Sequence, residues 1–132
     1  MKKTLVLGAT TNPARYAYLA VQRLSQKGHE VVPVGIKTGK INGIPIMQGR
    51  PEVEDVDTIT LYLGAERQRE YYDYLLSLKP KRIIFNPGAE NPELAELAEK
   101  QKIEVVEGCT LVMLSVGTYW RIRVTFVARH YC

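Results

Sequence analysis

A short polar loop near the start of the chain has the side chains best suited to hold an anion. Its members are Gly8, Ala9, Thr10, Thr11, Asn12, Pro13, Ala14 and Arg15. Gly8 permits a tight turn, and a helix that opens at Asn12 or Pro13 would direct free N–H groups and a positive dipole end at the loop. Arg15 adds a guanidinium that can bind phosphate through two hydrogen bonds. The segment predicts a phosphate-binding loop, with an ordinary strand-to-helix turn as the alternative.

The loop differs from the best-known nucleotide-binding motifs. A dinucleotide fingerprint needs glycines where Thr10 and Pro13 stand, and no Gly-Lys-Ser/Thr follows to make a Walker A loop. Folds that bind NAD also place an acid at the end of the second strand, where this sequence has residues 34–37, Val-Gly-Ile-Lys. Lys37 and Lys40 instead favour a ribose that bears a phosphate, as in coenzyme A or NADP. For either lysine alone, a solvated loop is the simpler interpretation.

Two further loops are expected at the same edge of the fold. The first contains Tyr62 and Gly64, where a glycine would let a ligand approach the backbone. Arg67 or Arg69 could reach a pyrophosphate from the helix that follows, although a solvent-facing position is the favoured interpretation for both. The second is residues 86–91, in which Asn86 can donate to a ligand. Because ligands bind beyond the carboxyl ends of parallel strands, we expect these loops, Gly35 and Lys37 to line one site.

Groups suited to catalysis are scarce in this sequence. His29 precedes the second strand, at the wrong end of the sheet, and His130 lies near the C-terminus. No Ser-His-Asp order or paired-carboxylate motif stands out. Cys109 follows the last repeating strand, where a small buried residue is the favoured interpretation. We therefore expect binding without catalysis, and no metal site.

The elements that position these residues alternate between strand and helix. Short apolar runs predict strands over residues 4–8, 30–34, 57–63, 82–86 and 103–106, with a short edge strand over 44–47. Helical spacing predicts a first helix from Asn12-Pro13 to about Gly28, a second over 65–78, and a third capped by Asn91-Pro92. Short connections between them predict an α/β fold with a doubly wound parallel sheet and helices on both faces.

The C-terminal segment follows another pattern. Ile122, Val124 and Phe126 alternate with polar residues, as in a half-buried strand. We expect one domain over residues 1–118 and an extension over 119–132 that is either an added edge strand or disordered.

Composition narrows the classes of function. The chain has 132 residues and 45% hydrophobic residues, as a single globular domain does. Its net charge of +4 owes most to Arg121, Arg123 and Arg129, so a broad basic face for nucleic acid is not expected. The apolar runs are too short for a signal peptide or a membrane span. Two distant cysteines fit a reducing, cytoplasmic setting, and a homodimer is the default expectation for assembly.

Several segments, in order, resemble the CoA-binding domain family of small bacterial and archaeal proteins. They are Leu7–Thr10, Arg15-Tyr16, Gly28–Val34, Gly43–Ile46, Asn86–Asn91 and Glu104–Cys109. The likeness covers about residues 2–118. The family is similar to the nucleotide-binding domain of the succinyl-CoA ligase alpha subunit, but this chain has no second domain with a phosphorylated histidine. The resemblance therefore does not predict acyl-CoA ligation by this chain alone.

The resemblance implies a Rossmann-like sheet of five to six strands in the order 3-2-1-4-5, with coenzyme A across the loops after the first strands. It carries over as binding residues Gly8, Ala9, Thr10, Arg15, Gly35, Lys37, Tyr62 and Asn86. Thr11, Asn12 and Gly64 are further candidates because they lie in the same predicted loops.

Three functions remain open from the sequence. The first is non-catalytic binding of coenzyme A or an acyl-CoA. The second is an enzyme subunit that uses NADP or a CoA thioester and needs a partner. The third is an interaction module whose nucleotide pocket has degenerated.

Overall fold

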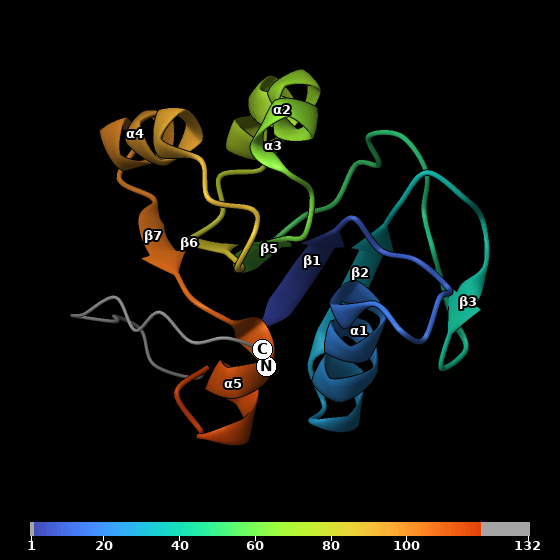
Figure 1. Cartoon of the computed structure of the whole chain (residues 1–132). Coiled ribbons are helices and arrows are strands. Elements are labelled where there is room, and N and C mark those ends of the chain that lie inside the picture. Colours follow the sequence, from blue (N-terminus) through green and yellow to red (C-terminus); the bar gives the residue numbers. More distant parts are fainter. Residues whose placement is uncertain (1, 120–132) are drawn as a thin grey trace.

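The computed structural model describes residues 2–119 and has a central parallel sheet with helices on both faces (Figure 1). The five strands lie in the order β2-β1-β5-β6-β7. Their bounds are β1 Lys3–Leu7, β2 Glu30–Val34, β5 Thr58–Leu61, β6 Arg82–Phe85 and β7 Glu104–Glu107. The helices are α1 Tyr16–Gln26, α2 Ala65–Gln68, α3 Tyr72–Ser77, α4 Pro92–Lys100 and α5 Thr110–Ser115, with a 3₁₀ turn η1 at Arg69–Tyr71. The predicted α/β class and the doubly wound order are confirmed.

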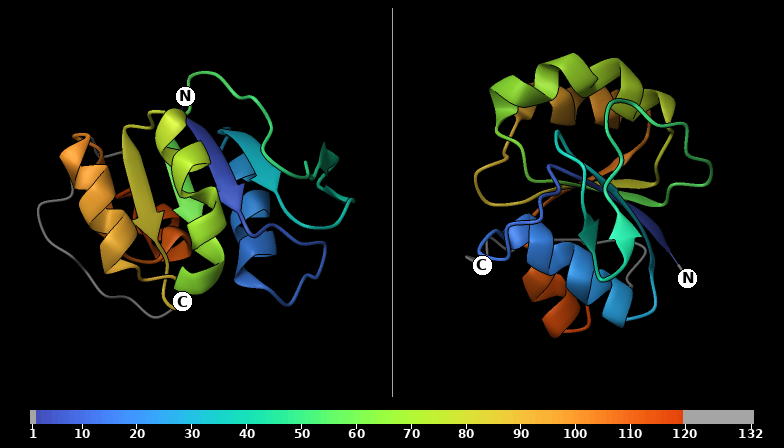
Figure 2. Two further views of the ribbon diagram at one scale, coloured as in Figure 1. Left: turned by 90° about the horizontal axis from the view of Figure 1, so that it is seen from above. Right: turned by 90° about the vertical axis from the view of Figure 1, so that its right-hand side faces the viewer.

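Two apolar layers sandwich the sheet, because alternate strand residues point to opposite faces. Leu5 and Ile83 belong to the layer that α2, α3 and α4 cover. Val6 and Ile84 belong to the layer on the side of α1 and α5. Figure 2 shows these two helical layers on either side of the sheet. All residues of β5 and β6 are buried. This agrees with the prediction, from their apolar sequences, that these strands are covered on both faces.

The predicted edge strand over residues 44–47 takes a different form. Residues Lys40–Ile41 (β3) and Ile44–Pro45 (β4) pair as a small antiparallel ribbon. Met47 then joins the edge of β2 through a single parallel bridge to Val34. Pro45 has no N–H to donate to a ladder, which is consistent with so short a pairing.

The first helix begins later than the sequence predicts. We expected Asn12 as its cap, but α1 begins at Tyr16 and Arg15 is the capping position. The side-chain oxygen of Asn12 instead accepts a hydrogen bond from the Ala14 N–H at 3.0 Å, and the main-chain carbonyl of Asn12 accepts one from the Arg15 N–H. Asn side chains stabilise such local turns in competition with helix.

The remaining helices match the prediction in part. Asn91 caps α4 as predicted, since its side-chain oxygen accepts a hydrogen bond from the Leu94 N–H. The expected helix over 65–78 is divided into α2, η1 and α3. Helix α5 was not predicted, and within residues 2–119 no helix is long and apolar enough to cross a membrane.

Tyr119 packs into the domain at the end of the described chain. Its side chain is fully buried, and its hydroxyl forms a 2.6 Å hydrogen bond with Thr4 Oγ1. The predicted domain boundary at residue 118 and the strand pattern of the extension rest on residues 120–132, which lie outside the described residues.

Candidate functional site

A groove of about 700 Å³ lies where the predicted loops converge. It follows the carboxyl ends of β2, β1, β5 and β6, and its wall includes Gly35, Ala9, Leu63 and Pro87 from the loops after these four strands. Its volume is within the range of about 300–1,000 Å³ that small-molecule sites have. The groove therefore occupies the position where open parallel sheets bind ligands.

Main-chain contacts fix the floor of the groove. The N–H groups of Gly8 and Ala9 both donate to the Val34 carbonyl at 2.9 Å. Gly35 passes so close that a Cβ there would lie 2.2 Å from the Ala9 carbonyl oxygen. Gly8 has a positive φ of 102°, which suits glycine. These two glycines join the first two loops, and the Gly8 and Ala9 amides are already satisfied by protein.

The first turn of α1 supplies further backbone donors. The first N–H groups of a helix have no partner within it, and α1 has no side-chain cap. Tyr16 and Ala17, which begin this eleven-residue helix, line the groove beside Thr10 and Thr11. The positive end of the helix dipole thus faces the groove and favours an anion there.

The charges around the groove have one sign. Arg15, Lys37 and Arg67 line it, whereas none of its lining residues is an aspartate or glutamate. All three cations are exposed. The wall thus favours a ligand with several negative charges.

Tyr62 is among the residues that line the groove, and it keeps its hydroxyl inside the protein. Burial raises the pKa of this hydroxyl well above its ordinary value, and the nearby Thr110 and Thr60 hydroxyls lower it only in part. The phenol therefore stays protonated at neutral pH.

Asn86 is placed beneath the groove and not in its lining. Its side-chain nitrogen donates to Thr60 Oγ1 at 2.6 Å and to the Leu61 carbonyl at 2.9 Å. Its side-chain oxygen accepts from the Thr110 N–H at 2.9 Å, at the start of α5. Since the amide has these three protein partners, it connects β5, β6 and α5.

The structure gathers most of the predicted site residues into this one groove. Those that line it are Gly8, Ala9, Thr10, Thr11, Arg15, Gly35, Lys37 and Tyr62. Asn12, Gly64 and Asn86 do not line it. Sequence reasoning missed Tyr16, Ile36 and Tyr71, which do. Tyr16 belongs to the segment Arg15-Tyr16 on which the family resemblance rests, so only the resemblance could have indicated it. Nothing in the sequence indicated that Ile36 and Tyr71 would line a site.

His29 and Cys109 lie outside the groove lining. His29 is buried just before β2, at the opposite edge of the sheet, and its ring lies 5.1 Å from the Tyr119 ring. Cys109 is fully buried beside Ala20 and Leu111. Among residues 2–119, no three His, Cys, Asp or Glu side chains gather closely enough to hold a metal.

A comparison with protein families agrees with this geometry. Residues 2–115 match the family described as CoA binding domain. The chain belongs to this family. No curated protein matches the sequence.

Several solved structures share the fold. One uncharacterised protein is 58% identical, with a TM-score of 0.88 over 90% of this chain and 98% of that chain. A Thermus thermophilus protein is 21% identical, with a TM-score of 0.77 over 89% and 90% of the two chains. An acetyl-coenzyme A synthetase from Ca. Korarchaeum cryptofilum, solved with phosphate and ADP, is 17% identical; the TM-score is 0.65 over 80% of this chain and 25% of that one.

Proposed function

We propose that this chain binds coenzyme A, free or acylated, in the groove at the carboxyl edge of the sheet, without catalysing a reaction itself. The observation that carries the proposal is the groove wall, which combines Arg15 and Lys37 with the open end of α1 and has no carboxylate among its described residues. A diphosphate fits such a site because N–H donors and positive charge both stabilise it. Arg15, Thr10 and Thr11 would hold it.

The end of β2 favours coenzyme A over NAD. A cofactor with bare ribose hydroxyls is usually held by an acid at this position. Here Lys37 lines the groove, two residues after Gly35. A cation suits the 3′-phosphate that coenzyme A carries on its ribose, and it also suits the phosphate of NADP. Membership of the CoA-binding family favours coenzyme A between these two.

The proposal of binding without catalysis rests on the residues that line the groove. They include three tyrosines and two threonines, but no histidine, cysteine or carboxylate. General acid–base catalysis near neutral pH depends on groups with a pKa in that range. Tyr62, with its raised pKa, is a poor base at neutral pH.

Thermal unfolding with a series of nucleotides tests the proposal. We expect coenzyme A to raise the unfolding temperature clearly more than dephospho-CoA, which lacks the ribose 3′-phosphate, and more than NADP or NAD. Titration calorimetry with coenzyme A should give one site per chain. Equal shifts for all four compounds would contradict the proposal, and so would the absence of any shift with coenzyme A.

A pair of lysine variants tests the role of the second loop. Lys37→Ala should remove most of the preference for coenzyme A over dephospho-CoA, because the phosphate would lose its cation. Lys40→Ala is the matched control, since Lys40 is equally exposed but lies outside the groove lining. If the two variants keep the same preference, Lys37 does not contact the 3′-phosphate.

Production of any new compound during incubation with acetyl-CoA would contradict the non-catalytic role.

A further inference from the structure

The groove has a second cationic end, away from the loops proposed to hold the phosphates. Arg67 on α2 lines the groove together with Tyr71 and Pro87, which follow β5 and β6. Arg15 and Lys37 lie instead in the loops after β1 and β2. Tyr62 and Leu63 line the groove after β5. The positive charge is thus divided between the two sides of the groove.

A buried network holds this part of α2 in place. Gln68 is fully buried and donates 2.8 Å hydrogen bonds to the carbonyls of Leu63 and Ala89, which belong to the loops after β5 and β6. The Gln68 oxygen accepts a hydrogen bond from Asn91 Nδ2 at 2.9 Å. The Gln68 side chain thus joins both loops to the start of α4. These bonds fix the position of the α2 backbone from which Arg67 and Arg69 extend.

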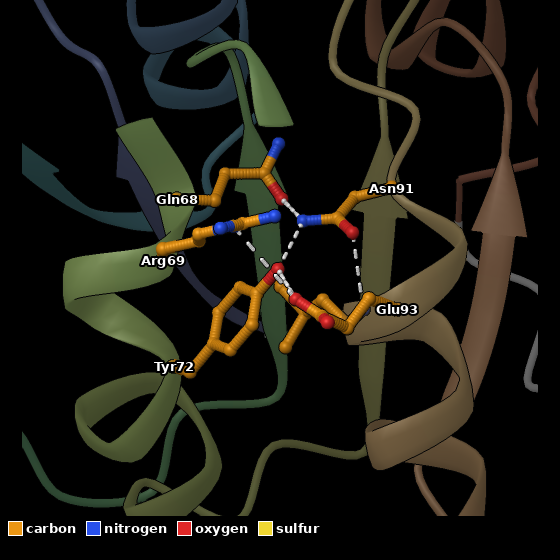
Figure 3. Close-up of polar contacts among 6 residues, drawn as sticks. Gln68, Arg69, Tyr72, Asn91 and Glu93 are labelled. Atoms are coloured by element: carbon orange, nitrogen blue, oxygen red, sulfur yellow. Dashed lines mark hydrogen bonds and ion pairs between the residues drawn. The ribbon is translucent and has the colours of Figure 1, made fainter. Parts of the chain in front are cut away.

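Arg69 points away from the groove. Its guanidinium pairs with Glu93 at 3.9 Å, and the Tyr72 hydroxyl donates to the same carboxylate at 2.9 Å. Figure 3 shows Arg69, Gln68 and Tyr72 directed toward Asn91 and Glu93. Of the two arginines on this stretch, only Arg67 therefore lines the groove.

Arg67 has no acidic partner in the described part of the chain. The ion pairs of residues 2–119 do not include it, and the neighbouring Glu66 and Glu70 do not line the groove. Beside it, Tyr71 presents a ring whose face is covered by Arg50, with the guanidinium carbon 5.1 Å from the ring centre. This end of the groove thus combines a guanidinium with a second positive charge behind the aromatic ring.

Coenzyme A itself has no charge to offer this end. Its phosphates belong to the nucleotide half, and the arm that leads to the thiol carries a hydroxyl and two amides, all of them neutral. If the phosphates bind at Arg15 and Lys37, the arm is the part that crosses Tyr62 and Leu63. A cation near the thiol end would then face whatever group is attached to the sulfur.

We propose that the groove selects acyl-CoA molecules whose acyl chain ends in a carboxylate, and that Arg67 binds this carboxylate. The proposal rests on the proposed function, since it assumes that the nucleotide half lies over the β1 and β2 loops. A guanidinium binds a carboxylate through two parallel hydrogen bonds, which gives both affinity and direction. Arg67 is then a specificity-determining residue and takes no part in a chemical step.

The test compares two acyl-CoA molecules of equal chain length by titration calorimetry. Glutaryl-CoA ends in a carboxylate, and pentanoyl-CoA has the same number of carbons and ends in a methyl group. We expect the intact chain to bind glutaryl-CoA about tenfold more tightly. Arg67→Gln should remove this preference, and it should lower the affinity for glutaryl-CoA much more than the affinity for free coenzyme A. Arg69→Gln, the matched control on the same stretch, should keep the preference.

The possible results separate this proposal from the proposed function. Equal binding of the two acyl-CoA molecules by the intact chain overturns the carboxylate preference, even if coenzyme A binds. A similar loss for free coenzyme A and glutaryl-CoA in Arg67→Gln also overturns it, because Arg67 would then contact coenzyme A itself. If no CoA compound binds, both proposals fail together.

Discussion

Replacement of Gly35 by alanine should disrupt the joint between the first two loops of the groove. The added Cβ would lie 2.2 Å from the Ala9 carbonyl oxygen and 3.2 Å from Ile46 Cγ2. An ordinary carbon–oxygen contact needs about 3.3 Å, so the backbone must move by about 1 Å. That movement weakens the two hydrogen bonds from Gly8 and Ala9 to the Val34 carbonyl.

The magnitude follows from these contacts. Overpacking costs about 1–3 kcal/mol, and each of the two hydrogen bonds adds about 0.5–1.5 kcal/mol. We expect Gly35→Ala to lower the free energy of unfolding by about 4 kcal/mol, which is a large share of the stability of a typical domain. For a chain of this size, the midpoint of thermal unfolding should fall by about 15 °C.

Urea unfolding followed by circular dichroism measures this loss, with Gly64→Ala as the control. Gly64 has an ordinary φ of −64°, and no atom lies within 4 Å of the position of its added Cβ. The control should therefore stay within about 1 kcal/mol of the original chain. If the free energy of unfolding of Gly35→Ala also lies within about 1 kcal/mol of that of the original chain, the close approach of the two loops does not contribute the expected stability.

Three further predictions concern other parts of the molecule. Asn86→Ala should cost about 2–4 kcal/mol in urea unfolding, because buried partners such as the Thr110 N–H lose their hydrogen bonds; a loss below 1 kcal/mol would contradict this role. Burial lowers the pKa of His29, so the unfolded chain takes up the proton more readily, and stability should fall as pH drops from 7 to 5; the same slope in His29→Asn would exclude this cause. Arg15→Ala should weaken coenzyme A binding about tenfold at low salt and less at high salt, whereas Arg23→Ala in the last turn of α1 should not; calorimetry at two salt concentrations decides between these outcomes.

Much of the sheet was predictable because its strands are buried on both faces. A strand such as Ile83–Phe85 has to be apolar throughout, so its sequence differs visibly from that of a surface helix. The Asn91-Pro92 cap was also readable, since proline in the first turn leaves few other choices. The same signal at Asn12-Pro13 was misleading, because the side chain of Asn12 closes a turn of its own.

The groove was only partly predictable. Its glycines and cations follow strand ends, and position in a parallel sheet is enough to bring them together. Gln68 could not be found in this way, because a glutamine within a charged stretch is expected to face solvent. Its burial depends on carbonyl groups in two distant loops, Leu63 and Ala89, whose positions no local pattern encodes.

The contacts of the Val34 carbonyl bear on how this site could be re-engineered. They set the shape of the groove floor through main-chain atoms, so exchanging the side chains above need not change that shape. Lys37 and Arg67 line the groove and have exposed side chains. A library that varies these two positions and leaves the glycines untouched would search for new ligand preferences on an unchanged scaffold.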